Sequence, residues 1–524
     1  DESEELKIEQ MLKDKFSALA LFISRSSDVL PEYKEYERGM TTALNAKVGP
    51  LMQGYLARLE DRLKDDGKRD VALSIMQSSG GITGARQAGR YPVKLLLSGP
   101  AGGLKGAQVT ARESKAGRLL SFDMGGTSTD VSIIDGDIGL TNDAKIGGYP
   151  VAVAMVDMHT IGAGGGSIAR VDAGGLLLVG PESAGADPGP ACYGKGGRAP
   201  TVTDANVVLG RLLPQSFLGG DMQLDKQSSI DAVQCIADGL ATGIEQAAKG
   251  VIDVVNDHMV RALRVMSVER GEDPRDYTLV SFGGAGGLHV CALAKELEMR
   301  RAMVPVNAGV LSALGMLAAD ASCERSRTIS SCLEDCDKQF IEQVFVELVA
   351  HAFEELKQGF ISNKEKQAVL LAAQQAMEEG SLVYDEKIEI KLSVDVRYQG
   401  QSHTLELPWS GLKEVAPAFH KKHMSDYGHE LAIDVELVNL RVRLVERSES
   451  FSLPRWQATE ELKEYFTSLA GFDEPVRVIN RAGLSIGQVI EGPALITEIS
   501  STTWLEEDWQ AEVDTSGNLL LSIH

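Results

Sequence analysis

The sequence is short of cysteine, of aromatic side chains and of positive charge, and it has no long apolar run. Six cysteines in 524 residues are too few for a disulfide framework, so they predict a protein of the reducing cytoplasm. A formal net charge of −23 argues against proteins that bind nucleic acid or anionic lipid through positive charge. The missing apolar run argues against a membrane-spanning protein. What remains is a large acidic protein with small-molecule partners.

The order of local patterns predicts an α/β protein that ends in a β-rich segment. Residues 17–24 (SALALFIS) and 277–282 (YTLVSF) are apolar enough for buried strands. A long helix is expected from about Glu245 to Arg270, with Gly271 as its stop. Alternating apolar residues from Ile388 to Val396 predict a half-buried strand.

The stretch DMGGTSTD (123–130) is the first candidate site. Glycines allow backbone N–H groups to approach a phosphate, and hydroxyl side chains add donors. The loop residues are Gly125, Gly126, Thr127, Ser128 and Thr129. Asp123 and Asp130 flank the loop, where carboxylates could hold Mg²⁺ through water. The alternative is a plain hairpin turn, but such a turn needs neither carboxylate, so the residues favour a phosphate loop.

The stretch SFGGAGGLH (281–289) is the second candidate. A buried strand enters Gly283, Gly284, Ala285 and Gly286, and a helix is expected to follow. A dinucleotide fingerprint fails here, because His289 stands where its third glycine should be. Nucleotide binding and close packing of strand on helix are equally compatible with these residues.

Three weaker patterns carry other candidates. Asp157 and His159 share one face of an expected strand, as a metal or proton-transfer pair or as a structural hydrogen-bonded pair. GPACYGK (189–195) matches a P-loop only in its letters, because no strand precedes it and no helix follows. In HKKHMSDYGH (420–429), the three histidines and Asp426 could form a metal site but look more like the polar face of a helix, and CLEDC (332–336) lacks a second cysteine pair at zinc spacing. The many glycines of 147–200 predict ordered loops close to a ligand or another backbone.

Several long motifs, in order, resemble the hydantoinase A/5-oxoprolinase family, whose relatives include the ATP-binding subunits of acetone and acetophenone carboxylases. They are FDMGGTSTDVSIIDG, VDMHTIGAGGGSIARVD, SVERGEDPRDYTLVSFGGAGGLH and GVLSALGMLAAD. The resemblance implies an actin/hexokinase-like (ribonuclease H-like) fold of two related α/β lobes. In that scheme Asp123–Asp130 is the phosphate hairpin of the second lobe and Phe282–Gly286 faces adenosine. Ser98–Val109 and Val306–Asp320 are small-residue helices that cross closely at the hinge.

The resemblance also implies how the chain divides into domains. Residues 1–118 correspond to the rest of a first lobe with a hinge helix, and 119–330 to the second lobe, with a glycine-rich insertion at 147–200. A helical connector (331–379) and a β-rich C-terminal domain (380–524) follow. The family pattern includes a first-lobe copy of D-x-G-G-T, whereas this chain has only the one at Asp123. The expectation is therefore that most of the N-terminal lobe is missing and that the nucleotide cleft is half built.

The implied function is that of an ATP-binding hydantoinase A-type subunit, which opens a cyclic amide of the hydantoin or 5-oxoproline type by hydrolysis. The implied cofactors are ATP and Mg²⁺, and the implied partner is a hydantoinase B-type second subunit. Asp123 and Asp130 are the expected catalytic and metal-holding residues. Asp157 and His159 are expected on the substrate side. The alternatives are a subunit of an ATP-dependent ketone carboxylase and a non-catalytic nucleotide-binding subunit.

Overall fold

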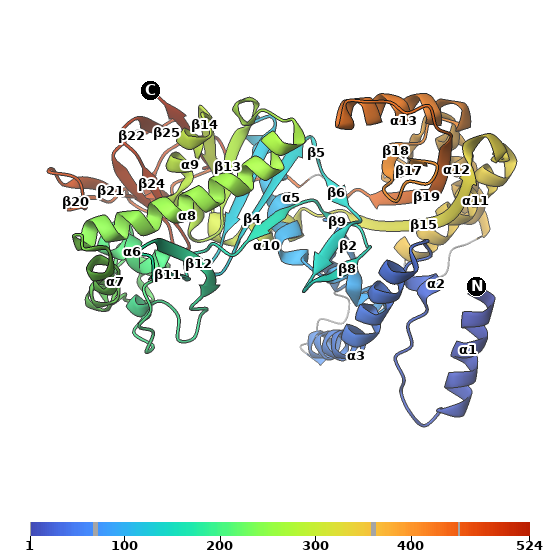
Figure 1. The fold of residues 1–524 in the computed structure, drawn as a ribbon, viewed down its shortest axis with the longest axis horizontal. Helices are drawn as coiled ribbons and strands as arrows, with labels where there is room; N and C mark the ends of the chain where they lie inside the picture. The colour runs from blue at the N-terminus through green and yellow to red at the C-terminus, as the bar shows by residue number, and fades with distance from the viewer. Residues whose placement is uncertain (1, 66–71, 358–362, 449–450) are drawn as a thin grey trace. The chain divides into compact units, whose positions relative to one another are not determined.

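The computed structural model describes residues 2–65, 72–357, 363–448 and 451–524, and the chain forms two compact units (Figure 1). Both units are assembled from three separate segments of the chain. The first unit comprises Asp1–Ala101, Leu140–Val156 and Ala319–Phe451. The second comprises Gly102–Gly139, Asp157–Ala318 and Ser452–His524.

The first unit is built on a sheet with strand order β1-β2-β15-β19-β17-β16, and β18 pairs with β17. Its strands are β1 (Ser74–Met76), β2 (Ile82–Gly84), β15 (Ala321–Cys332), β16 (Ser381–Tyr384), β17 (Ile388–Tyr398), β18 (Leu405–Pro408) and β19 (Val435–Glu446). Its helices include α1 (Glu2–Lys15), α2 (Ser26–Val29), α3 (Glu35–Asp65), α4 (Ala85–Arg90), α11 (Lys338–Leu356), α12 (Asn363–Glu379) and α13 (Leu412–Tyr427). Short ribbons β6 (Leu140–Thr141) with β9 (Met155–Val156) and β7 (Ala144–Ile146) with β8 (Tyr149–Val151) complete it.

The alternation predicted for the strand after residue 386 is confirmed in β17. Ile388, Ile390, Leu392, Val394 and Val396 are all buried. They join one hydrophobic core with side chains of α11, among them Phe345 and Val349, and with alternate residues of β19. The alternating apolar residues of the sequence therefore mark the face of the sheet against which α11 packs.

The strand predicted at residues 17–24 is wrong. Those residues run without helix or strand between α1 and α2, and Leu19 and Leu21 are exposed. The ring of Phe22 instead lies against Gly49 of α3, where it occupies space that a side chain would fill. An apolar run forms a strand only where a neighbouring strand can pair its backbone groups, and none of the described strands pairs with these residues.

The second unit is built on a sheet with strand order β10-β4-β3-β13-β14-β26-β25-β22, and β5 pairs with β4. The bounds are β3 (Leu119–Met124), β4 (Thr129–Asp135), β5 (Asp137–Ile138), β10 (His159–Ile161), β13 (Thr278–Phe282), β14 (Arg301–Val304), β22 (Val489–Glu491), β25 (Trp509–Val513) and β26 (Leu519–Ile523). The pair β11 (Ser167–Val171) and β12 (Leu177–Ser183) and the sheet β20 (Glu464–Thr467), β21 (Val476–Asn480), β23 (Ala494–Thr497) and β24 (Thr502–Leu505) stand beside it. Strand β13 runs parallel to both β3 and β14, as in α/β folds.

The helices of the second unit include the long helix predicted from the sequence. They are α5 (Ser98–Glu113), α6 (Val202–Val208), α7 (Lys226–Leu240), α8 (Ile244–Met266), α9 (Val290–Glu296) and α10 (Leu311–Leu317). The apolar stripe of α8 is buried, and the chain turns at Gly271 with a φ of +80°. Helices α5 and α10 cross so closely that a Cβ on Gly315 would lie 1.8 Å from the carbonyl oxygen of Gly102. The expected close crossing of two small-residue helices is thereby confirmed.

The strands after residue 380 do not all join one sheet. Strands β16 to β19 complete the sheet of the first unit, whereas β20 to β26 belong to the second. Whether the ranges 1–118, 119–330, 331–379 and 380–524 act as domains stays a prediction.

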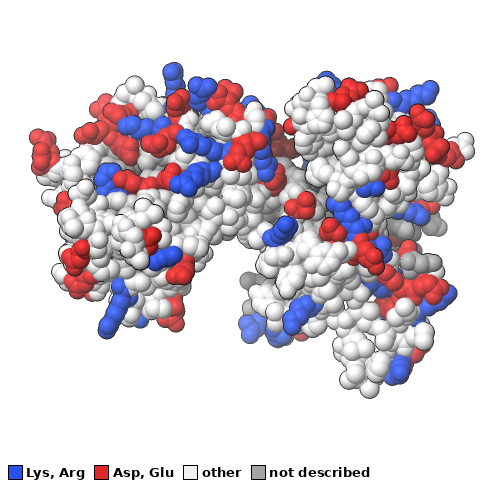
Figure 2. All heavy atoms as spheres, viewed as in Figure 1, with Lys and Arg blue, Asp and Glu red and all other residues white. Residues whose placement is uncertain are grey.

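Two further features are the distribution of charged side chains on the surface and the apolar character of the helices. Figure 2 shows acidic and basic side chains mixed over the face that it draws, so the excess negative charge is not gathered into one block there. Within the described ranges, no helix combines the length and the apolar character that crossing a bilayer requires.

Candidate phosphate and nucleotide site

The stretch DMGGTSTD forms a β-hairpin whose tip is the candidate loop. Strands β3 and β4 pair antiparallel, with Asp123 opposite Asp130 and Met124 opposite Thr129. The backbone N–H of Gly125 donates to the carbonyl of Ser128 (3.1 Å), which closes the tip. Gly126 and Thr127 are exposed at that tip. The loop is therefore both a hairpin turn and a set of backbone groups that a ligand can reach.

The backbone of a second glycine-rich segment, residues 164–166, contacts the hairpin tip and is hydrogen-bonded to it. The N–H of Gly165 donates to the carbonyl of Gly125 (3.0 Å), and the N–H of Gly166 donates to that of Gly126 (2.7 Å). A Cβ on Gly164 would lie 2.8 Å from the backbone nitrogens of Thr127 and Ser128. The density of glycine in this part of the sequence is thus explained by close backbone contact, one of the two expected reasons.

Asp123 and Asp130 lie on the same face of the sheet, as directly opposed residues must. Thr160 of β10 donates to Asp130 through its hydroxyl (2.6 Å), while the carboxylate of Asp123 accepts no hydrogen bond within the described residues. Burial raises the pKa of Asp123 to about 6, with the nearby charge of Asp130 as a second cause. Burial also raises the pKa of Asp130, and the hydrogen bond from Thr160 offsets part of that rise.

These carboxylates fit a divalent cation with its water shell. Each is penalised in its charged form, and neither forms an ion pair with a basic side chain of the described chain. A cation placed beside them would relieve both burial and mutual repulsion. The described residues contain no group of three or more His, Cys, Asp and Glu side chains that could hold a metal directly. The site therefore suits Mg²⁺ held partly through water and phosphate, which is its usual binding mode.

The second glycine stretch lies directly beside the first. In the parallel pair β3–β13, Phe282 is opposite Asp123. Gly283 has a φ of +79°, and a Cβ there would lie 2.3 Å from Oδ1 of Asp123. The N–H of Ala285 donates to the carbonyl of Met124 (3.1 Å). The structure thus brings the two predicted stretches together at the carboxyl ends of two parallel strands, where open α/β sheets bind their ligands.

His289 is a residue that sequence reasoning missed as part of this site. It is 1% exposed, and its Nδ1 lies 2.7 Å from Oδ1 of Asn256 on α8. Burial, and then the charge of Arg211, lower its pKa to about 3, so the ring stays neutral. The ring ties the end of the Gly283–Gly286 turn to α8. The sequence feature that could have indicated this role is a polar residue at the beginning of an otherwise apolar helix.

Asp157 and His159 do not join the two carboxylates. Asp157 forms an ion pair with Arg270, with Oδ1 3.1 Å from Nη2. His159 pairs in register with Val131, so it lies on the sheet face opposite to Thr160 and Asp130. No hydrogen bond joins Asp157 to His159 in the part of the chain that the structure describes. Their role on the substrate side stays a prediction.

The P-loop-like stretch at 189–195 has a structural explanation. The carboxylate of Asp204 is fully buried and accepts hydrogen bonds from the backbone N–H groups of Ala191 (3.2 Å) and Cys192 (2.9 Å). The hydroxyls of Thr201 and Ser229 also donate to it. An internal carboxylate thus occupies the backbone donors that a phosphate would need.

Comparisons with known proteins show which family the sequence resembles. The family model described as hydantoinase/oxoprolinase matches residues 38–325, more than half of the chain. Caprolactamase subunit alpha of Pseudomonas jessenii is 33% identical over 96% of this chain and 72% of its own length. The uncharacterized protein MJ0964 of Methanocaldococcus jannaschii is 38% identical over 94% of this chain and 71% of its own. The 5-oxoprolinase of Dictyostelium discoideum is 30% identical over 96% of this chain but 40% of its own.

Two solved structures share the fold. The crystal structure of ATP-dependent caprolactamase from P. jessenii has a TM-score of 0.83 at 31% identity, over 100% of this chain and 75% of that one. A nucleotide-free acetone carboxylase has a TM-score of 0.72 at 24% identity, over 95% of this chain and 71% of that one. The predicted fold class, an α/β fold of the actin-like nucleotide-binding type, is confirmed.

Proposed function

Because the chain belongs to the hydantoinase/oxoprolinase family, we propose that it is the ATP-binding subunit of an enzyme that opens a cyclic amide by hydrolysis. Relatives named caprolactamase and 5-oxoprolinase support a lactam as the substrate class. The name "subunit alpha" of the caprolactamase relative supports a second subunit, which we propose to be of the hydantoinase B type. The six free cysteines support a cytoplasmic enzyme.

The proposed role of ATP follows from the stability of an amide. Hydrolysis of an unstrained lactam is slow because resonance makes the carbonyl carbon a poor electrophile and the nitrogen a poor leaving group. Transfer of the γ-phosphoryl group to that oxygen forms an O–P bond, breaks the bond to ADP and leaves a carbon that water can attack. Attack by water and cleavage of the C–N bond release the amine and leave an acyl phosphate, and a second water then releases phosphate to give the open amino acid. One ATP and two waters are therefore consumed for each ring.

One observation carries this proposal for the chain itself. Asp123 and Asp130 form a pair of carboxylates without a basic partner among the described residues, next to exposed backbone groups of a hairpin tip and beside the Gly283 turn. In our proposal Asp123 and Asp130 hold Mg²⁺ through water, and the metal offsets charge on the phosphates. Residues Gly125 to Thr129 contact phosphate and Gly283 to Gly286 face adenosine. This arrangement binds phosphate by backbone donors and metal rather than by lysine.

The test is steady-state ATPase activity of the chain together with its second subunit. 5-Oxoproline, hydantoin, caprolactam, acetone with bicarbonate, and no addition are compared. We expect a cyclic amide to stimulate phosphate release and ring opening in equal amounts. We expect Asp123→Asn to lower kcat by at least about 100-fold, the scale of losing a charge-stabilising group. The control is Asp253→Asn, which removes an exposed carboxylate paired with Lys249 on α8.

Other outcomes of that experiment would replace the proposal. Stimulation by acetone with bicarbonate alone would make the chain a carboxylase subunit, and no turnover with any addition would make it a non-catalytic nucleotide-binding subunit. Full ATPase activity in Asp123→Asn would show that the phosphate site lies elsewhere.

A further inference from the structure

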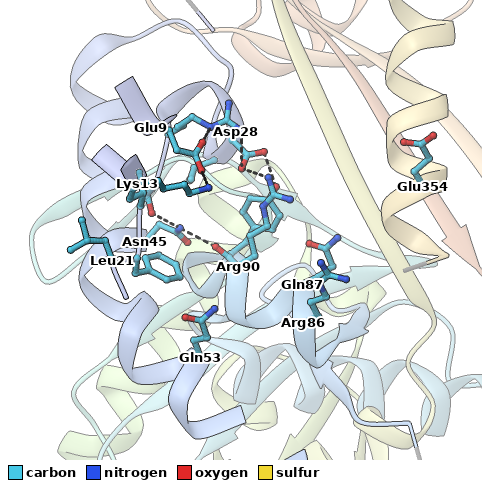
Figure 3. Close-up of a pocket in the computed structure, with 16 residues that line it drawn as sticks. Glu9, Lys13, Leu21, Asp28, Asn45, Gln53, Arg86, Gln87, Arg90 and Glu354 are labelled. Carbon is cyan, nitrogen blue, oxygen red and sulfur yellow. Dashed lines mark hydrogen bonds and ion pairs between the residues drawn. The ribbon is translucent and has the colours of Figure 1, made fainter. Parts of the chain in front are cut away.

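The first unit contains a cavity that none of the predicted site residues lines. It has a volume of about 590 Å³ and lies among α1, the segment 21–25, α3 and α4 (Figure 3). Small-molecule sites in proteins usually measure about 300–1,000 Å³. The cavity is thus large enough for a metabolite of the size of an amino acid with its water.

Two glycines bring the walls of this cavity together. A Cβ on Gly49 of α3 would lie 2.1 Å from Cε1 of Phe22, so the glycine admits the ring to the wall. A Cβ on Gly89 of α4 would lie 3.6 Å from Cα of Gln53, so α4 packs directly on α3 at that level. The result is an aromatic wall at Phe22 and a polar wall where the two helices meet.

The cavity carries spare positive charge in a strongly acidic chain. Its lining has four basic side chains and three carboxylates: Lys13, Arg25, Arg86, Arg90, Glu9, Asp28 and Glu354. Arg25 pairs with Glu9 (2.6 Å) and Arg90 with Asp28 (2.6 Å). The exposed guanidinium of Arg86, by contrast, has neither an ion pair nor a hydrogen bond within the described residues. Its guanidinium is available to take a carboxylate in the two-pronged manner that arginine favours.

Three side-chain amides line the same cavity, and that of Asn45 is hydrogen-bonded to Ser24 and to the carbonyl of Arg90. Oε1 of Gln87 is buried and has no hydrogen-bond partner among the described residues. The amide of Gln53 makes no hydrogen bond within the described residues either. In Figure 3 the side chains of Arg86 and Gln87 lie together on α4. A buried amide oxygen without a donor is costly, so a ligand that supplies an N–H is favoured here.

We propose that this cavity binds a small carboxylate that also carries an amide. Arg86 binds the carboxylate, Gln87 and Gln53 pair with the amide, and the ring of Phe22 covers the apolar part. The site lies wholly in the first unit and does not depend on the phosphate hairpin or on the proposed reaction.

The proposal is tested by isothermal titration calorimetry without ATP, using 5-oxoproline, which carries both groups. Caprolactam lacks the carboxylate and acetate lacks the amide, and each is expected to bind at least about tenfold more weakly. Arg86→Gln is expected to weaken 5-oxoproline binding about tenfold or more. Arg62→Gln, an exposed arginine of α3 outside the cavity, is the control and should bind as the native chain does.

A second pair of variants tests the shape of the cavity. Gly49→Ala places a methyl group against Phe22, whereas Gly39→Ala on the same helix meets open space. Only Gly49→Ala should lower the affinity. Equal binding of 5-oxoproline to the native chain and to Arg86→Gln would overturn the proposal, as would an absence of binding to the native chain. Asp123→Asn should leave this binding unchanged, so failure here is distinguishable from failure of the proposed function.

Discussion

Each unit contains a pair of acidic side chains held close together. Within the described residues, only the pair of the first unit has a basic side chain of the protein beside it. In the first unit, Glu32 and Asp395 surround the guanidinium of Arg441. In the second, Asp123 and Asp130 face each other without a basic partner among the described residues. The same residue types therefore serve two purposes, and the presence of a cation from the protein itself separates them.

The carboxylates of the first-unit cluster have a cation of the protein beside them. Arg441, Glu32 and Asp395 are 6%, 8% and 4% exposed. Nη1 of Arg441 lies 2.7 Å from Oε1 of Glu32, and Nη2 lies 2.6 Å from Oδ2 of Asp395. Although burial alone lowers the pKa of Arg441, the adjacent carboxylates hold it well above its usual range. Asn439 and Ser326 supply further donors, and Glu324 lies 3.6 Å from Nη1 of Arg441 as a third carboxylate.

The second-unit pair lacks a basic partner among the described residues, and this difference supports our proposal that it is a functional site. Acidic groups that remain near each other without a cation raise each other's pKa and reduce stability. A chain retains such an arrangement where a bound group supplies the missing charge. The comparison therefore separates a structural cluster from a ligand site by charge balance rather than by residue type.

The largest expected effect comes from breaking the balanced cluster. Arg441→Leu leaves two buried carboxylates without their cation, which costs about 3–5 kcal/mol in the free energy of unfolding. Urea denaturation at pH 7, followed by circular dichroism, measures this loss. The ATP affinity of the fraction that remains folded should stay unchanged, because Arg441 belongs to the first unit and the residues of the proposed phosphate site belong to the second.

Arg443→Leu is the matched control for that measurement. Arg443 lies two residues further along β19 on the same face and is only partly buried. Its loss should cost less than about 1 kcal/mol. Equal losses in the two variants would mean that the ionic cluster contributes nothing specific to the first unit.

Asp123→Asn should change the free energy of unfolding in the opposite direction, as a gain in stability, and by a smaller amount. The pKa of Asp123 is about 6 in the folded chain, against about 3.9 for an unperturbed aspartate. The folded state therefore binds more protons between pH 4 and 6, and stability falls as the pH rises through that window. Above pH 6 the native chain carries the full penalty. Asparagine removes it, so the variant should gain about 1–2 kcal/mol at pH 7.5 after allowance for solvent screening.

The measurement is the free energy of unfolding from pH 4 to 8 for both chains, without nucleotide or metal. The difference between the chains should grow from pH 4 to 6 and then stay constant. A variant that is less stable than the native chain at pH 7.5 would show that Asp123 is a structural residue after all. Added Mg²⁺ should raise the stability of the native chain and leave the variant unaffected.

The hairpin could be predicted from the sequence because its information is local. Two apolar strands, the Asp135–Gly136 turn and the flanking carboxylates lie within one short stretch. The contact that completes the carboxylate pair comes from further away, since Thr160 reaches Asp130 from 30 residues along the chain. The ion pair that engages Asp157 comes from further still, from Arg270 at a separation of 113 residues. The failed strand at 17–24 has the same cause, since its local pattern says nothing about whether a partner strand exists.

The smallest expected effect tests how Asp130 differs from Asp123. The hydroxyl of Thr160 donates to Asp130 and restrains the rise of its pKa, whereas Asp123 has no such donor. Thr160→Val keeps the β-branched shape that suits the strand and removes the donor. The pKa of Asp130 should therefore rise further, and the free energy of unfolding at pH 7.5 should fall by about 0.5–1.5 kcal/mol. Carboxyl-carbon NMR of labelled aspartate, followed through the titration, measures the pKa directly.

The surface variant Thr242→Val, which loses a hydrogen bond to Gln246, should leave this titration unchanged. If Thr160→Val also leaves it unchanged, hydrogen bonding does not distinguish the two carboxylates, and burial alone sets both pKa values.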